Sequence, residues 1–153
     1  MAPPVLLDVS IPMYAGGSDH PYRAPCVWIL EQVSEGRLEV AVNTETIQEV
    51  LHRYGALQRW QTAIMMASNL IQLVSTVYPV QETDARLAIQ LFGQHAPHGV
   101  KARDLIHAAV MRNNGLTQII STDRHFDQIE GITRLDPNEL YRAGRAGGGA
   151  NRD

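Results

Sequence analysis

Four acidic residues, Asp8, Glu49, Asp104 and Asp123, border or interrupt apolar stretches that are spread over most of the chain. A carboxylate beside a buried strand or on a half-buried helix is costly unless it is paired or binds a cation. Carboxylate oxygens are hard ligands of the kind that Mg²⁺ and Mn²⁺ prefer. If the fold brings the four side chains together, they predict a site for one of these ions.

Short apolar runs alternate with amphipathic segments along the chain. The predicted strands cover residues 5–8, 38–42, 73–80, 118–121 and 132–135. The predicted helices cover residues of about 22–34, 44–54, 57–71, 83–92 and 104–113. This alternation is typical of parallel strands joined by right-handed crossovers, so we expect an α/β layered domain.

The layout gives the four acids a common location, because ligands bind outside the carboxyl ends of the strands in open parallel sheets. Asp8 ends the first strand, and Asp123 lies just past the fourth. Glu49 lies in the opening turns of the helix after the second strand, about 200° around the axis from the apolar Ile47. Asp104 opens the helix that leads into the fourth strand. Each alone has a simpler explanation as a turn former, a helix cap or a solvated helix residue, but together they indicate one shared metal site.

Size and composition indicate one ordinary globular domain. The chain has 153 residues, of which 44% are hydrophobic and 19% charged. We assign residues 1–142 to the domain, and expect the Gly-rich residues 143–153 to be a flexible tail, since they have no apolar period. A signal peptide and an apolar run of about 20 residues are both missing, so we expect a cytoplasmic protein without membrane contact.

The sequence disfavours several other classes of function. The net charge of −3 argues against a broadly basic protein that coats nucleic acid. Cys26 is the single cysteine and lies on an apolar helix face, where core packing is the simpler role. Phosphate-binding Gly-rich motifs are absent. Pro97 breaks the alignment of His95 and His98 that a zinc site would need, and His107 fits a packed helix position.

Two phosphoaspartate enzymes also place an Asp after the first strand, but neither fits. A haloacid-dehalogenase-type phosphatase needs a second Asp where Ser10 stands, and a receiver domain needs a Lys at the end of a late strand, whereas Lys101 precedes a helix.

The chain resembles the PIN-domain nucleases, and most closely the small VapC-type toxins, over residues of about 5–137. The segments that carry the likeness are Leu6-Leu7-Asp8-Val9-Ser10, the helix with Glu49, Asp104-Leu105-Ile106-His107-Ala108-Ala109 and Ser121-Thr122-Asp123-Arg124-His125-Phe126. The resemblance implies a three-layer α/β/α sandwich with a central parallel sheet. It also implies a metal-dependent endoribonuclease in which Mg²⁺ or Mn²⁺ assists hydrolysis of RNA phosphodiester bonds.

Mapped onto this chain, the resemblance makes the four acids the catalytic metal ligands. It gives Ser10, Ser121 and Thr122 the role of supporting hydroxyls behind those ligands. Basic residues next to the acids in sequence are candidates for substrate phosphate contacts. These candidates are Lys101, Arg103 and Arg124.

Two positions depart from the family pattern. Many relatives carry an acid two positions after the one that matches Asp123, and His125 stands there in this chain, with Asp127 two residues further on. Val9 follows Asp8, where the family often has Thr. The change at His125 favours one tightly bound ion over two.

The resemblance also implies partners, namely a homodimer and a cognate antitoxin that neutralises the toxin. Two early helices support this expectation, because they carry more apolar surface than a small sheet needs to cover. Their apolar residues are Tyr22, Val27, Trp28 and Ile29 in one helix, and Trp60, Ile64, Met65, Met66 and Leu70 in the other. The alternative is a non-catalytic PIN module that binds RNA or a protein partner, which metal-dependent cleavage would distinguish.

Overall fold

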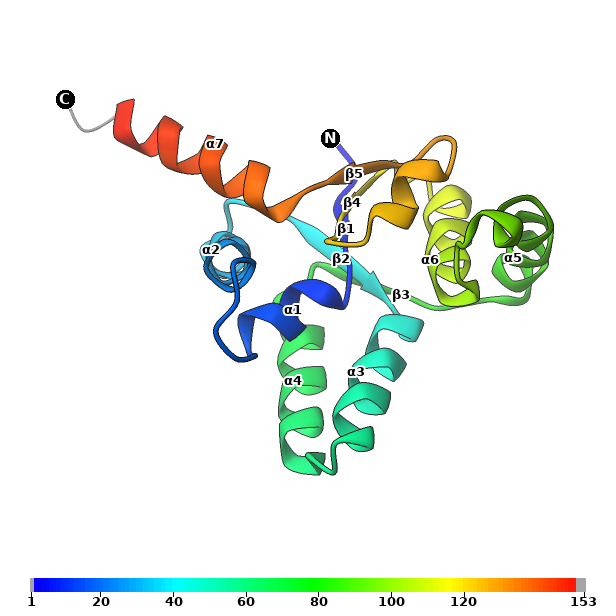
Figure 1. Cartoon of the computed structure of the whole chain (residues 1–153), viewed down its shortest axis with the longest axis horizontal. Helices are drawn as coiled ribbons and strands as arrows, with labels where there is room; N and C mark the ends of the chain where they lie inside the picture. The colour runs from blue at the N-terminus through cyan, green and yellow to red at the C-terminus, as the bar shows by residue number, and fades with distance from the viewer. Residues whose placement is uncertain (1, 151–153) are drawn as a thin grey trace.

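A parallel sheet forms the centre of the computed structural model, which describes residues 2–150 (Figure 1). Within these residues the sheet has five strands, and their order is β3-β2-β1-β4-β5 with every neighbouring pair parallel. The strands are β1 (Val5–Leu7), β2 (Val40–Asn43), β3 (Thr76–Tyr78), β4 (Gln118–Ile120) and β5 (Thr133–Leu135). All five lie within or beside the predicted strand segments.

Helices connect and cover the strands. They are α1 (Ser10–Ala15), α2 (Arg23–Ser34), α3 (Thr44–Ala56), α4 (Trp60–Leu73), α5 (Glu82–His95), α6 (Ala102–Asn113) and α7 (Pro137–Ala150), with short 3₁₀ helices η1 (Ala96–His98) and η2 (Arg124–Gln128). The five predicted helices correspond to α2 to α6. Helices α1 and α7 were not predicted from the sequence.

The sheet separates two hydrophobic cores, as the alternation of side chains along a strand requires. Leu7 faces a core that includes Ile29 of α2 and Val50 of α3. Its neighbour Leu6 faces the opposite core, with Leu91 of α5 and Leu105 of α6. Helices α1 to α4 therefore cover one face and α5 and α6 the other, and the predicted three-layer α/β/α sandwich is confirmed.

Helix α3 begins directly at the end of β2, and a capping box fixes this junction. The Asn43 side chain accepts a hydrogen bond from the Thr46 backbone N–H at 3.1 Å, and the Thr46 hydroxyl accepts one from the Asn43 N–H at 3.4 Å. Since β2 passes into α3 without a loop, the second turn of α3, which carries Glu49, is held at the carboxyl edge of the sheet.

The C-terminal segment differs from the prediction. We expect a flexible tail from residue 143, but α7 continues as a helix through Ala150, so a boundary at residue 142 would fall inside it. The helix rests on α2, where the rings of Trp28 and Tyr141 pack edge to face at 5.9 Å. Gly144 lies against the Trp28 ring, where a side chain would collide. Residues 151–153 of the predicted tail lie outside the described residues.

No helix within residues 2–150 combines the length and the apolar character needed to span a membrane.

Candidate active site

The four acids line one cleft at the carboxyl edge of the sheet, with a volume of about 370 Å³. Asp8 follows β1 and Asp123 follows β4, and these two strands are neighbours. The chain runs from β1 outward through β2 and β3 on one side, and through β4 and β5 on the other. The acids therefore lie where the strand order reverses, which is the usual ligand position in such sheets.

We call this site the acidic cleft and define it by Asp8, Glu49, Asp104 and Asp123. Asp8, Glu49 and Asp104 are buried, with about 5% of each residue exposed, and Asp123 is partly exposed. The predicted convergence of the four residues is confirmed. Their roles as metal ligands stay a proposal.

Two serine hydroxyls hold Asp8 in place. Ser10 Oγ donates to Asp8 Oδ2 at 2.8 Å, and Ser121 Oγ donates to the same oxygen at 2.7 Å. The Asp123 N–H donates to Ser121 Oγ at 3.0 Å, and the Thr122 N–H donates to Ser10 Oγ at 3.3 Å. Because both hydroxyls use Oδ2, the second oxygen of Asp8 is left for a ligand in the cleft. Ser10 and Ser121 thus have the predicted supporting contacts, whereas Thr122 contributes its backbone.

Glu49 is held by a histidine that the sequence analysis treats as a packed helix residue. His107 of α6 is almost fully buried, and its Nε2 makes a close hydrogen bond with Glu49 Oε1. Its Nδ1 lies 2.8 Å from Asn43 Nδ2. The burial of His107 is therefore predicted correctly from the sequence, but its contact with Glu49 is not predicted.

The capping box at Asn43 determines which nitrogen of His107 carries the proton. Asn43 Oδ1 already accepts from Thr46, so the Nδ2 group faces the ring and donates to Nδ1. The proton is then on Nε2, which donates to Glu49. Burial lowers the pKa of His107, but the hydrogen bond and the negative charge of Glu49 outweigh it and raise the pKa overall. The hydrogen bond from Nε2 fixes the orientation of Glu49.

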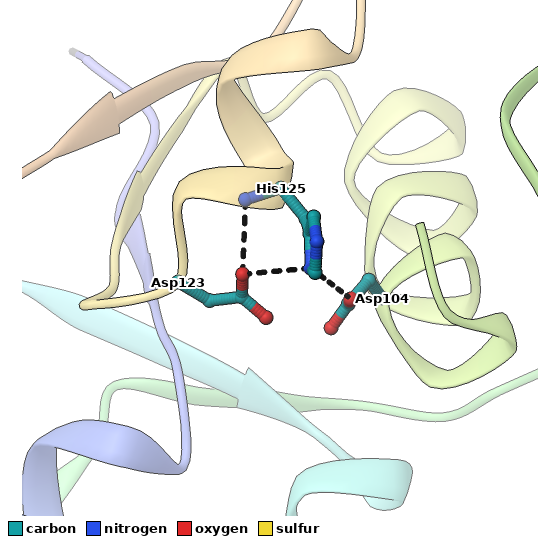
Figure 2. A group of neighbouring side chains, drawn as sticks. All are labelled: Asp104, Asp123 and His125. Carbon is teal, nitrogen blue, oxygen red and sulfur yellow. Dashed lines mark hydrogen bonds and ion pairs between the residues drawn. The ribbon is translucent and has the colours of Figure 1, made fainter. Parts of the chain in front are cut away.

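Asp104 and Asp123 of the cleft form a group with the neighbouring His125 (Figure 2). His125 Nδ1 lies 3.1 Å from Asp123 Oδ1 and 4.0 Å from Asp104 Oδ2. Among the described residues, both Asp104 Oδ2 and His125 Nδ1 are buried without a hydrogen-bond partner. Burial raises the pKa of Asp104 to about 6, and the neighbouring charges of Asp123 and Asp8 add to the effect.

This environment fits a divalent cation. Carboxylates that are buried, close together and partly unpaired repel one another unless a positive charge lies between them. The donors are mostly carboxylate oxygens, which suit Mg²⁺ or Mn²⁺. Asp8, Glu49, Asp104 and Asp123 would hold such an ion.

Basic residues line part of the cleft wall, but they are not all the predicted ones. Arg103 lines the cleft, and so does Arg53, which the sequence analysis missed. Arg53 lies four residues after Glu49 on α3, so the helical repeat was a signal that could have found it. Lys101 and Arg124 are exposed and are not among the lining residues.

The other sequence candidates lie outside the cleft. Asp127 forms an ion pair with Arg134 at 3.0 Å, so it does not replace the missing family acid. Cys26 is fully buried in the core, as expected. Burial, with a smaller contribution from the charge of Asp136, raises the pKa of its thiol to about 12. That thiol is therefore a poor nucleophile.

A second, apolar cavity lies between α1, α2 and α4 and has a volume of about 630 Å³. Val27, Leu30, Met65 and Met66 are among its lining residues. Helix α1 separates it from the acidic cleft, since Pro12 lines this cavity and Met13 lines the cleft. Of the predicted surplus apolar residues, Ile29 and Leu70 are core, while Trp60, Ile64 and Met65 are more than half exposed.

Comparisons with known proteins agree with this geometry. The PIN domain family model matches residues 5–132. A VapC ribonuclease of Mycobacterium bovis is 34% identical over 131 residues, which are 86% of this chain and 98% of that protein. Among solved structures, the sarcin-ricin loop cleaving toxin VapC20 of Mycobacterium tuberculosis superposes with a TM-score of 0.67 at 15% identity, covering 81% of this chain and 93% of that one. A toxin–antitoxin complex from Klebsiella pneumoniae gives a TM-score of 0.61 at 18% identity, covering 87% and 97%.

Proposed function

The chain belongs to the PIN-domain family and, within it, to the VapC ribonucleases, and from this membership we propose that it is a metal-dependent endoribonuclease that acts as the toxin of a toxin–antitoxin pair. The observation that carries the proposal is the convergence of four carboxylates in one cleft, with a buried Asp104 oxygen that lacks a partner within residues 2–150. The cofactor that fits this cleft is Mg²⁺ or Mn²⁺.

The residues of the cleft divide the work of phosphodiester hydrolysis. When bound, the ion supplies a positive charge that acidifies a water molecule and neutralises charge developing on the phosphate. Asp8, held by two serine hydroxyls, presents its free oxygen at a fixed position. Glu49, oriented by His107, either completes the set of ligands around the ion or accepts a proton from the attacking water. Fixed positions for these groups lower the cost of reaching the reactive geometry.

The substrate is single-stranded or structured RNA. Arg53 and Arg103 lie in the wall of the cleft, where each can contact a phosphate that flanks the one being cleaved. Lys101 and Arg124 are exposed and lie next to cleft residues in sequence, so they are further candidates for contacts with more distant phosphates.

The partners are a cognate antitoxin and a second copy of the chain. The apolar cavity between α1, α2 and α4 lies beside the acidic cleft, so an antitoxin segment that fills it can reach the carboxylates with a basic side chain. The exposed apolar residues of α4, Trp60, Ile64 and Met65, supply a surface for dimerisation. Sedimentation tests the dimer, and a clean monomer at tens of micromolar would contradict it.

Cleavage of RNA by the purified protein tests the activity. We expect cleavage with Mg²⁺ or Mn²⁺ and loss of cleavage with EDTA. Asp8→Asn and Asp104→Asn should abolish it, whereas Asp19→Asn, at an exposed acid outside the acidic cleft, should not. Undiminished cleavage by Asp8→Asn would refute the assigned site. A folded protein that binds RNA or a partner but never cleaves would favour the alternative of a non-catalytic PIN module.

A further inference from the structure

The imidazole of His125 lies close to two residues of the acidic cleft, Asp123 and Asp104. His125 lies in the first turn of η2, where the Asp123 carboxylate accepts a hydrogen bond from the His125 N–H at 2.9 Å. This turn brings the imidazole over Asp123 and toward the first turn of α6. The outer nitrogen Nε2 faces Gly99, 3.8 Å from where a Cβ would lie at that position. The inner nitrogen Nδ1 faces the carboxylates (Figure 2).

The direction of Nδ1 does not match a simple hydrogen bond. It lies 3.1 Å from Asp123 Oδ1, yet its geometry satisfies no hydrogen bond to any described residue. Asp104 Oδ2, 4.0 Å away on the other side, is also buried and unpartnered among those residues. Asp104 Oδ2 and His125 Nδ1 face one another across 4.0 Å, so a single ion between them would satisfy both atoms.

The distances within this group fit an ion. Two donors on adjacent corners of an octahedron with bonds of about 2.1 Å are about 3.0 Å apart, and on opposite corners about 4.2 Å. The spacings of 3.1 Å and 4.0 Å from Nδ1 match these two cases. One donor atom from each of Asp104, Asp123 and His125 lies within 4.8 Å of the others.

We propose that His125 Nδ1 is a direct ligand of the ion in the acidic cleft, and that this nitrogen makes the site prefer Mn²⁺ to Mg²⁺. The inference rests on the proposed metal-dependent function and deepens it. Mg²⁺ demands hard oxygen ligands and gives up its water reluctantly. An imidazole nitrogen is a softer donor that first-row transition ions accept more readily. A carboxylate in place of His125 would remove this preference.

The competing explanation is that His125 is a charged imidazolium that only pairs with the two carboxylates. In that case the ring would be displaced when an ion binds, and it would contribute no nitrogen to the coordination sphere. Pulsed electron paramagnetic resonance of bound Mn²⁺ separates the two, because a directly bound imidazole produces nitrogen modulation of the Mn²⁺ signal. This readout does not depend on RNA cleavage.

The experiment uses the purified full chain, stripped of metal and loaded with Mn²⁺ or Mg²⁺. Dissociation constants for both ions are measured on the wild type, His125→Asp, His125→Ala and the control His20→Asp. His20 lines the acidic cleft but lies outside the three-residue donor group, so this control adds the same charge near the acids without replacing a donor. Thermal melting in EDTA checks that each variant is folded.

We expect nitrogen modulation in the wild type and in His20→Asp, and its loss in both His125 variants. The preference for Mn²⁺ over Mg²⁺ should be lost in His125→Asp, because an oxygen ligand that both ions accept replaces the softer nitrogen. In His20→Asp both ions should bind more tightly and the ratio should stay constant. His125→Ala should weaken Mn²⁺ more than Mg²⁺.

Two other results have distinct meanings. Mn²⁺ that binds the wild type without nitrogen modulation, or an unchanged ion ratio in His125→Asp, would overturn the ligand role of His125 and leave the ribonuclease proposal intact. Absence of Mn²⁺ binding by the wild type, with the same result for Asp104→Asn, would overturn the metal site itself and both proposals with it.

Discussion

Replacing Asp104 by Asn should stabilise the metal-free protein at neutral pH while abolishing its activity. Burial, followed by the charges of Asp123 and Asp8, raises the pKa of Asp104 to about 6 from an ordinary value of 3.8. The folded state thus binds a proton more tightly than the unfolded state does. Stability from this group is fully present below about pH 3.8 and is lost as the pH rises through about 6. At pH 7 the ionised Asp104 therefore destabilises the fold.

The size of the effect follows from that shift. A displacement of about two pKa units corresponds to about 3 kcal/mol at pH 7, since each unit is worth about 1.4 kcal/mol. Asn keeps the size of Asp but loses the negative charge, so a gain of about 1–3 kcal/mol is expected. For a domain of this length, each kcal/mol raises the melting temperature by about 2–4 °C.

Urea and thermal unfolding in EDTA, from pH 4 to pH 8, measure this difference. The gain of Asp104→Asn should be largest at pH 7 to 8 and should shrink as Asp104 becomes protonated. Adding Mn²⁺ should raise the stability of the wild type but not that of Asp104→Asn, because the ion supplies the missing countercharge.

Asp84 offers a matched control, because its replacement by Asn should lower the stability of the fold instead of raising it. It is also a buried Asp in the first turn of a helix, but its carboxylate accepts hydrogen bonds from the Gln81 N–H and from Asn113 Nδ2, both at 2.8 Å. Asp84→Asn should therefore destabilise the fold by about 1–3 kcal/mol. Equal destabilisation by both substitutions, or a gain for Asp104→Asn that does not depend on pH, would refute the reasoning.

Three further substitutions test the packing around the cleft and the core. His107→Ala should lower kcat for RNA by about tenfold or more with little change in KM, because Glu49 loses its orientation; a normal kcat would contradict that role. Gly144→Ala should detach α7 from Trp28 and lower the melting temperature, and unchanged tryptophan fluorescence would argue against this contact. Cys26→Ala should keep full activity and cost about 1 kcal/mol of unfolding free energy, and lost activity in a folded variant would show that the thiol matters.

The strand-end acids could be predicted because their positions depend on local pattern. Asp8 and Asp123 follow short apolar runs, and parallel strands bring their carboxyl ends to one edge whatever the details of packing. The supporting hydroxyls of Ser10 and Ser121 were expected from the family resemblance, and both donate to Asp8.

The features that the sequence analysis missed depend on contacts between distant segments. The pattern around His107 predicts burial correctly, but its pairing with Glu49 requires α3 and α6 to meet across the edge of the sheet. Helix α7 is amphipathic, so a local signal for the helix was present, but its docking comes from Trp28, more than 100 residues earlier in the sequence. Local periodicity carries no information about such partners.

Asn43 has a consequence for which substitutions this chain can tolerate. Asp is as good an N-cap as Asn, so helix α3 alone would accept Asn43→Asp. In this fold, however, Asn43 Nδ2 donates a hydrogen bond to His107 Nδ1. The second oxygen of an Asp at this position could only accept a hydrogen bond, so Nδ1 would have to carry a proton. The ring would become doubly protonated next to Glu49, and a cationic neighbour would weaken that carboxylate as a base. An exchange that is neutral for the helix would therefore be selected against through the chemistry of the cleft.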